Sequence, residues 1–481
     1  MKMRSSSTNS CWGSPKGVLV CVGVASGVAA LGWLAFGLCM RKGKCAPEFE
    51  KRVPRESGKA ARFTVMDVKK HGGAVFSDNL EQISAVDDGC EVCVGEVLSN
   101  EDMMVYCIDS IVDPASGEYR TIVCFVDIQD KEKLWTEAFL DRGIRQWIRP
   151  NSKAYLVTVD TLVDYIAKNG LDDDIRSGSK ELSFVWNTGR CGSTLMHKVL
   201  LASRKVCSFS EPMWLDQITR GNKAFSYVSS ADEWARIIRA LVVCDIALSP
   251  KHLKQCKYIS YNPKAFTTYE AMEYVFKAFE NDAQPLKHMY MYRKAAGVVN
   301  SFGSLFLGSR SRFERFLLYL ISPVTVGLMK MKHKYSSSLQ KSVEQEGPIP
   351  LPSSSIVVAK IAAGWLNNVQ YWCDMSTSRR ELERALIVRF DEITDKSKQR
   401  AIVSKVFEQF YSCNEPDVIN SAMEAFNTDS QKGSSMSSKT KRVEALSVAD
   451  RKALVEATKR IRGPVQVDPK GNILIEGSLQ A

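Results

Sequence analysis

The longest hydrophobic run in the chain, residues 17–40, contains no charged residue. As a helix it would be about 36 Å long, at about 1.5 Å per residue, which is enough to cross a bilayer. The run is longer than the hydrophobic part of a signal peptide, and no small-residue cleavage pattern follows it. The pattern therefore predicts an uncleaved transmembrane anchor after a short N-terminal tail, residues 1–16. A buried core helix is the poorer interpretation of so long an uncharged run.

Lysines and arginines flank this run unequally: three precede it and seven follow it within residues 41–59. Because the cytoplasmic flanks of membrane helices carry the excess of basic residues, this count places the C-terminal part of the chain in the cytoplasm. No Asn-x-Ser/Thr sequon occurs, so N-glycosylation gives no sign of a lumenal location.

The part that follows has the pattern of β-strands. After a basic stem, residues 41–62, two β-branched runs lie on either side of the turn residues 114–117 and predict a hairpin. We expect strands at 104–109, 119–127 and 154–159 and a helix at 131–147. Residues 63–179 are therefore predicted to form a small β-rich accessory segment.

From residue 180 onwards, short apolar runs alternate with longer amphipathic ones. We expect strands at 182–186, 206–209, 258–261, 288–292 and 386–390, with helices such as 194–203, 269–279 and 356–373 between them. Strands that alternate with helices predict a parallel sheet covered on both faces. The predicted fold class is α/β: a P-loop-like parallel sheet flanked by helices over residues 180–440, preceded by a single transmembrane helix and the small β-rich subdomain.

Two further segments have readable patterns. Residues 441–481 are predicted to form a C-terminal helix and a hairpin-like tail, because Ser447 and Asp450 have the spacing of a capping box. The apolar stretch 316–329 is broken by Pro323 and is too short for a second span. Buried packing is expected there, with a lid or a membrane-touching segment as the alternative.

Composition adds modest constraints. The 481 residues are 45% hydrophobic and 25% charged, which excludes collagen-like and wholly disordered chains. A formal net charge of +11 fits an anionic ligand, a membrane surface or nucleic acid without choosing among them. Cys90 and Cys93 form one CxxC pair, but a structural zinc site needs four ligands, so a redox pair or two ordinary thiols are the better interpretations.

The strand-to-helix turn at residues 186–194 carries the clearest chemistry; it reads Trp-Asn-Thr-Gly-Arg-Cys-Gly-Ser-Thr. Such a turn points several backbone N–H groups at one spot, at the positive end of the helix dipole, and glycine lets the backbone close on a phosphate. It is not a Walker A loop, because the spacing is shorter and no lysine follows the second glycine. An N-capped structural turn is the alternative.

A second element lies further along the chain. The predicted strand 288–292 is followed by Arg293 and, eight residues later, by Ser301. An arginine can fork onto a phosphate, and a serine in the next helix can donate to the same group. Together, the turn 188–194 and this Arg–Ser pair resemble the 5′-phosphosulfate loop and the 3′-phosphate site of the sulfotransferase superfamily. The resemblance covers about residues 180–440.

The resemblance implies 3′-phosphoadenosine 5′-phosphosulfate (PAPS) as the sulfuryl donor and no metal. By the resemblance, the donor-binding residues are Arg190, Cys191, Gly192, Ser193, Thr194, Arg293 and Ser301. Cys191 stands where the family usually has a serine and could make the site oxidisable. Residues 429–434 occupy the place of the family's late basic loop but lack the Arg-Lys-Gly sequence that is usual there.

Two further residues are implied to act in catalysis. Glu211 stands where membrane-bound, carbohydrate- or tyrosine-directed members have a carboxylate as general base; an ion pair with Arg190 is the alternative. Lys264 resembles a lysine that tyrosine-directed members place near the transferred group, with a surface lysine as the alternative. His197 and His252 are expected to be core or solvated histidines.

With the predicted anchor, the resemblance implies a membrane-anchored sulfotransferase of the Golgi or ER membrane that acts on a hydroxyl of a sugar, a tyrosine or a lipid-like molecule. The expected partners are PAPS, this acceptor and the lipid bilayer, without nucleic acid. Gly23 and Gly27 permit a homodimer through the anchor, although glycine is common in membrane helices. A P-loop-type nucleotide kinase and a non-catalytic nucleotide-binding membrane adaptor are the alternatives. The resemblance to Golgi enzymes implies that the C-terminal domain lies in the lumen, whereas the count of lysines and arginines places it in the cytoplasm.

Overall fold

The structure is a computed structural model of the whole chain. It describes residues 52–54, 56–68, 80–114, 116–135, 137, 140–219, 225, 227–228, 230–264, 271–308, 326, 335–428 and 444–479. All of them belong to the compact unit Phe49–Ala481. The predicted anchor at 17–40 lies outside the described residues, as does almost all of the apolar stretch 316–329.

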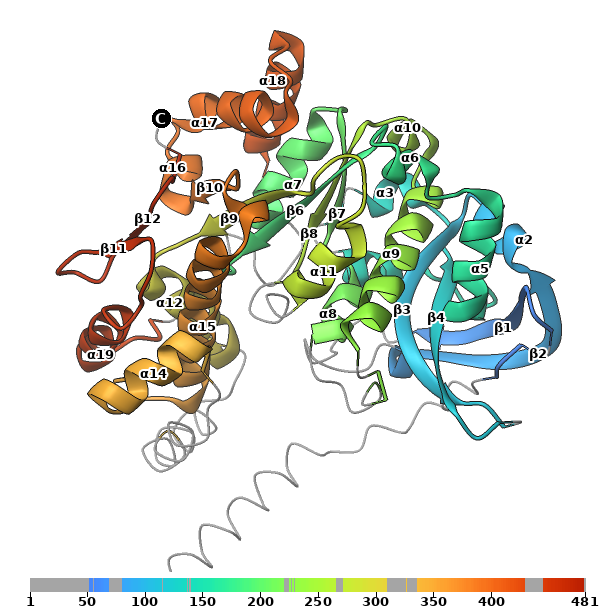
Figure 1. Cartoon of the computed structure of the whole chain (residues 1–481), viewed down its shortest axis with the longest axis horizontal. Coiled ribbons are helices and arrows are strands. Elements are labelled where there is room, and N and C mark those ends of the chain that lie inside the picture. Colours follow the sequence, from blue (N-terminus) through green and yellow to red (C-terminus); the bar gives the residue numbers. More distant parts are fainter. Residues whose placement is uncertain are drawn as a thin grey trace, which may run out of the picture. The chain divides into compact units, whose positions relative to one another are not determined.

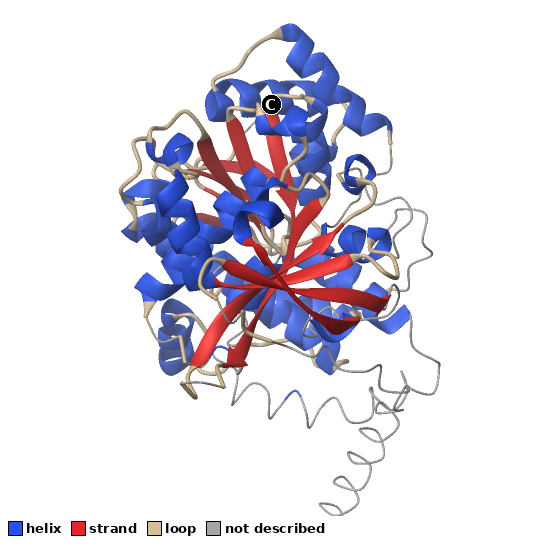
Figure 2. Ribbon diagram, turned by 90° about the vertical axis from the view of Figure 1, so that its right-hand side faces the viewer, coloured by secondary structure: helices blue, strands red, loops and turns tan. Residues whose placement is uncertain are grey.

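An antiparallel sheet of five strands forms the N-terminal part of this unit (Figure 2). In spatial order its strands are β2 (Ile83–Cys93), β1 (Lys59–Val68), β5 (Lys153–Thr158), β4 (Tyr119–Asp127) and β3 (Met103–Val112). The predicted hairpin is confirmed, because β3 and β4 pair antiparallel. Helices α5 (Val159–Asn169) and α9 (Ala231–Ala247) pack on this sheet (Figure 1).

A second sheet of five strands is parallel throughout. In spatial order its strands are β10 (Leu386–Arg389), β9 (Lys287–Tyr292), β6 (Glu181–Asn187), β8 (Tyr258–Asn262) and β7 (Val206–Ser210). All five predicted strands are confirmed, each to within one residue at either end. They are almost wholly buried, which explains why they read as continuous apolar runs rather than as alternating ones.

The order of the parallel strands determines where a ligand can bind. Strand β6 lies in the middle; the chain then forms β7 and β8 on one side of it and β9 and β10 on the other. In open α/β sheets, ligands bind beyond the carboxyl ends of the strands at the point where the strand order reverses. Helix α7 (Ser193–Ala202) begins directly after the turn that leaves β6.

Further helices complete the unit (Figure 1). They are α2 (Val94–Ser99), α3 (Lys131–Leu134), α4 (Leu140–Trp147), α6 (Asp173–Arg176), α8 (Met213–Thr219), α10 (Lys251–Lys254), α11 (Met272–Phe279), α12 (Ala295–Gly308), α14 (Ser337–Glu346), α15 (Ile356–Ser378), α16 (Phe390–Thr394), α17 (Gln399–Lys405), α18 (Pro416–Met423) and α19 (Val448–Thr458). The capping box of α19 is confirmed, and the C-terminal hairpin is formed by β11 (Val465–Val467) and β12 (Ile473–Ile475).

The predicted helix at 131–147 is wrong in one respect, because two short helices, α3 and α4, occupy this range. Trp135 ends α3 and is buried. Its ring packs edge-on against Phe209 of β7, with the ring centroids 5.7 Å apart. A tertiary contact therefore interrupts a segment whose local pattern favours one helix.

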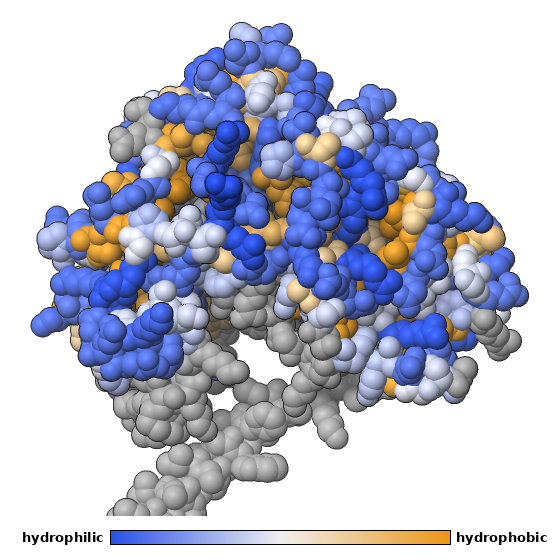
Figure 3. Space-filling view, in the orientation of Figure 1, coloured by the Kyte–Doolittle hydropathy of each residue, from blue (hydrophilic) through white to orange (hydrophobic). Residues whose placement is uncertain are grey.

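The predicted fold class is also wrong as a description of the chain. The β-rich part is not a small addition to a parallel α/β sheet, because its sheet has as many strands as the parallel one and is antiparallel. Within the described ranges, no helix is long and apolar enough to cross a membrane, so the transmembrane element of the predicted class has no counterpart there. On the face shown in Figure 3, hydrophilic side chains predominate and hydrophobic ones lie between them.

One side chain bonds helix α8 to the edge of the antiparallel sheet. Strand β3 is an edge strand, and Gln217 of α8 bonds to its open edge. The Ile108 N–H donates to Oε1 of Gln217 at 2.9 Å, and Nε2 of Gln217 donates to the Ile108 carbonyl at 2.7 Å. An edge strand presents unpaired backbone groups, and here a side-chain amide satisfies one pair of them.

Candidate functional site

The turn after β6 has the backbone geometry of an anion-binding loop. Gly192 is the N-cap of α7 and has a φ of 86°, in the left-handed region that favours glycine. Ser193 and Thr194 open the helix, and both are buried. The first turn of a helix leaves N–H groups without intrahelical partners, so this end of α7 can donate several hydrogen bonds to an anion.

Arg190 connects this loop to the second predicted element. Its Nε donates to Oγ of Ser301 on α12 at 2.9 Å, and its carbonyl accepts a hydrogen bond of 3.2 Å from Nη1 of Arg293. The structure therefore brings together three residues that the sequence placed in two separate phosphate sites. Arg190 itself has a φ of 52°.

Arg293 is held from several sides at the end of β9. Its backbone N–H donates to Oγ1 of Thr188 at 3.1 Å, and its guanidinium carbon lies 4.1 Å from the centre of the Phe390 ring. A Cβ at Gly297 would lie 2.6 Å from Nε of Arg293, so the arginine can lie along the first turn of α12 only because residue 297 has no side chain. These contacts preorganise the guanidinium beside the loop.

Cys191 does not have the property expected of an oxidisable site. The residue is fully buried, and burial raises the pKa of its thiol to about 11. The thiolate is the reactive form of cysteine, so a buried thiol with a raised pKa is inert. The prediction that Cys191 could make the loop oxidisable is therefore wrong, because the side chain points into the core.

Glu211 directly follows β7 and has a strained backbone. Its φ is 53°, and its N–H donates to the Asn262 carbonyl at 2.8 Å, which continues the pairing of β7 with β8. A left-handed conformation costs a non-glycine residue free energy, and such residues cluster at functional sites. Glu211 and Arg190, both predicted site residues, share this conformation.

Lys264 lies two residues beyond β8 and is not a freely solvated lysine. Its Nζ is 3.8 Å from Oδ2 of Asp216 on α8, and the side chains of Lys264 and Asp216 are 17% and 3% exposed. Sequence reasoning missed Asp216. The signal in the sequence was its position: Asp216 lies five residues after Glu211, on the helix that follows.

Two asparagines at the ends of neighbouring strands were also missed. Asn187 is the last residue of β6 and Asn262 the last residue of β8, and both are buried. Nδ2 of Asn187 donates to the Pro263 carbonyl at 2.7 Å and to Oδ1 of Asn262 at 3.3 Å. A polar residue at the end of an apolar strand was the signal for both.

Of the two histidines, one lies in the core and the other at the surface, as expected. His197 is buried in α7, its Nδ1 lies 2.8 Å from Oγ of Ser208, and burial lowers its pKa to about 3. His252 is exposed, with Nδ1 3.3 Å from a carboxylate oxygen of Glu132.

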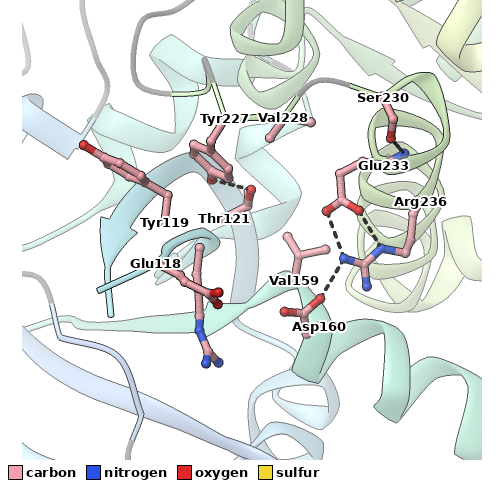
Figure 4. Close-up of a pocket in the computed structure, with 11 residues that line it drawn as sticks. Glu118, Tyr119, Thr121, Val159, Asp160, Tyr227, Val228, Ser230, Glu233 and Arg236 are labelled. Carbon is pink, nitrogen blue, oxygen red and sulfur yellow. Dashed lines mark hydrogen bonds and ion pairs between the residues drawn. The ribbon is translucent and has the colours of Figure 1, made fainter. Parts of the chain in front are cut away.

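A cavity of about 430 Å³ lies elsewhere, between β4, the start of α5 and α9 (Figure 4). Its lining includes none of the predicted site residues. Its polar groups largely pair with one another: Arg236 bonds to Asp160 and Glu233, and the hydroxyls of Tyr227 and Thr121 lie 2.6 Å apart. Such a cavity offers a ligand few unsatisfied partners.

The described residues contain no group of three or more histidine, cysteine or acidic side chains that could hold a metal ion. Cys90 and Cys93 are both exposed thiols on β2, and the Lys59 ammonium donates to Sγ of Cys93 at 3.4 Å. The predicted late loop, residues 429–434, lies outside the described residues.

No protein-family model matches the chain, and no curated protein matches it.

Proposed function

We propose that the chain is a sulfotransferase that moves a sulfuryl group from PAPS to an acceptor hydroxyl. The observation that carries this proposal is the network of Arg190, Ser301 and Arg293 beside the loop that opens α7. It stands at the reversal of strand order, where α/β sheets bind their ligands. Two guanidinium groups, several hydroxyls and the loop N–H groups are all donors, as a nucleotide with anionic groups at both ends requires.

The donor set divides between the two ends of such a nucleotide. The Arg190 guanidinium bonds to Ser301, and the Arg293 guanidinium bonds to the Arg190 carbonyl; both are assigned to the 3′-phosphate. The N–H groups at the start of α7, with Ser193 and Thr194, are assigned to the 5′ end. This differs from the sequence-based assignment of Arg190 to the 5′-phosphate, because its side chain reaches α12 rather than α7.

The acceptor end is assigned to Glu211 and Lys264. When bound, PAPS supplies the sulfuryl group. Glu211 removes the proton of the acceptor hydroxyl while the acceptor oxygen bonds to sulfur and the bond between sulfur and the 5′-phosphate oxygen breaks. The products are a sulfate ester and adenosine 3′,5′-bisphosphate. Lys264, oriented by Asp216, offsets negative charge on the leaving oxygen.

A binding titration tests this proposal. Purified protein is titrated with PAPS and with adenosine 3′,5′-bisphosphate, and ATP is added as competitor. Saturable binding of both ligands that excess ATP does not displace supports the proposal. Displacement by ATP would favour a nucleotide kinase instead.

Transfer of radiolabelled sulfur from PAPS to a mixture of phenolic, sugar and sterol hydroxyls then separates an enzyme from a nucleotide-binding adaptor. Binding without transfer to any of these acceptors, and without slow release of sulfate, would favour the adaptor.

A further inference from the structure

The buried amides of Asn187 and Asn262 can be oriented from their hydrogen bonds. Oδ1 of Asn187 accepts from the Gly189 N–H at 2.9 Å, and Nδ2 of the same residue donates to the Pro263 carbonyl at 2.7 Å. Both atoms of this amide are therefore fixed by backbone groups. The start of the loop, through Gly189, determines which way the Asn187 amide points.

This orientation fixes the second amide as well. Nδ2 of Asn187 lies 3.3 Å from the Asn262 side chain, which must present its oxygen there, because two NH₂ groups would repel each other. Nδ2 of Asn262 therefore points away from Asn187. The residue is only 2% exposed, and this atom is buried. It has no hydrogen-bond partner within the part of the chain that the structure describes.

A buried donor without a partner destabilises the folded state, so native structures satisfy nearly all such donors. A ligand bound beside Asn262 would supply the acceptor that its Nδ2 lacks. Its amide contacts Asn187 at the base of the loop, its carbonyl accepts from Glu211, and Lys264 follows two residues later. Asn262, the residue that carries the unsatisfied donor, thus ends the strand between β6, which leads into the loop assigned to the 5′ end of the nucleotide, and β7, which leads into Glu211.

We propose that Nδ2 of Asn262 donates a hydrogen bond to an oxygen of the transferred sulfuryl group. The inference rests on the proposed function and adds a residue that positions the reacting group. A sulfuryl group spreads negative charge over its oxygens, and a neutral amide fixed by a second amide can hold one of them without reorganisation. Asn262 distinguishes the sulfuryl-bearing donor from the product nucleotide, which lacks this group.

The test compares the affinities of two nucleotides for the full chain. In Asn262→Asp, Oδ1 still accepts from Asn187, so the buried pair survives, but the donor is replaced by an oxygen that repels an anion. We expect the affinity for PAPS to fall at least tenfold and that for adenosine 3′,5′-bisphosphate to change less than threefold. Asn262→Ala should also lower the affinity for PAPS more than that for the bisphosphate, but by a smaller factor. Ser260→Ala, a buried substitution two residues earlier on β8, is the matched control and should change neither affinity.

Three outcomes overturn the inference. Equal losses of affinity for both nucleotides would show that Asn262 supports the fold of the site rather than the sulfuryl group. Unchanged affinity for PAPS in both variants would show that its Nδ2 has no contact with the ligand. If the unsubstituted protein binds neither nucleotide, the proposed function fails first and this inference with it. The unsubstituted protein therefore distinguishes the two failures.

Discussion

Nε of Arg190 donates a 2.9 Å hydrogen bond to Oγ of Ser301, a residue 111 positions further along the chain. The bond joins the turn after β6 to the helix after β9, two strands that are neighbours in the parallel sheet. Ser301 is buried and Arg190 is half-buried, so the bond is partly shielded from water. The proposed anion site thus depends on a contact that no local stretch of sequence contains.

This contact should be visible in a double-mutant cycle. Arg190→Ala and Ser301→Ala remove the two partners separately and together, and the binding of adenosine 3′,5′-bisphosphate is measured by calorimetry. Because the residues share one network, we expect the losses to be non-additive, with a coupling of about 0.5–3 kcal/mol. Additive losses would indicate that the two side chains bind separate parts of the nucleotide.

Arg293→Ala should weaken the binding of adenosine 3′,5′-bisphosphate by about 1.5–3 kcal/mol, the range for a hydrogen bond to a charged group. The affinity for the analogue without the 3′-phosphate should barely change. Arg451→Ala, which removes an exposed arginine paired with Glu444, is the control. Equal losses for both ligands would show that Arg293 does not bind the 3′-phosphate.

Substitutions of Glu211 separate its chemistry from its backbone. Glu211→Gln keeps the shape and removes the basicity, so turnover should fall by about 10²–10⁴ while PAPS binding is unchanged. A rate within a few-fold of the unsubstituted protein would place the base elsewhere.

The φ of 53° at Glu211 predicts a second effect. Glu211→Gly should be more stable than Glu211→Ala by about 1 kcal/mol, because glycine adopts the left-handed region without steric cost. Denaturant unfolding of the two variants measures this difference. Equal stability would mean that the backbone relaxes when the side chain is removed.

Asp245 should make stability depend on pH. This buried carboxyl accepts hydrogen bonds from Nε1 of Trp214 and the hydroxyl of Tyr261, and burial raises its pKa to about 8. Between about pH 4 and 8 the folded state keeps a proton that the unfolded state has lost, so stability falls as pH rises, by at most about 1.4 kcal/mol per pH unit.

Asp245→Asn removes the titrating group and keeps an acceptor for Trp214. Unfolding in denaturant from pH 5 to 9 should therefore show a shallower decline for this variant than for the unsubstituted chain. Parallel curves would mean that Asp245 is ionised in the folded state.

Gln217→Leu should destabilise the protein by about 1–3 kcal/mol, because the Ile108 N–H and carbonyl lose their partners while the apolar volume is kept. Gln340→Leu, an exposed substitution on α14, is the control in the same unfolding experiment. A loss no larger than that of the control would show that water replaces the amide at the edge of β3.

The parallel sheet was predictable because its strands are continuous apolar runs, and the loop because glycines and hydroxyl residues follow one of them directly. The pairing of β1 with β2 was not, since register shifts between Ala61 and Phe63 and between Val65 and Asp67 break the two-residue alternation. The contribution of Asn262 was hidden for another reason. Its role depends on which atom of its amide faces Asn187, and only three-dimensional neighbours decide that.

The bond between Gln217 and β3 has a consequence for the order in which the chain folds. The antiparallel sheet uses only residues 59–158, all of which leave the ribosome before β6. Domains form from the N-terminus during synthesis, so this sheet can present a finished edge when α8 emerges. The helix after Glu211 then docks on an existing surface. The bond between Arg190 and Ser301 can form only after α12 has emerged, so the antiparallel sheet can serve as the template on which the parallel half of the unit assembles.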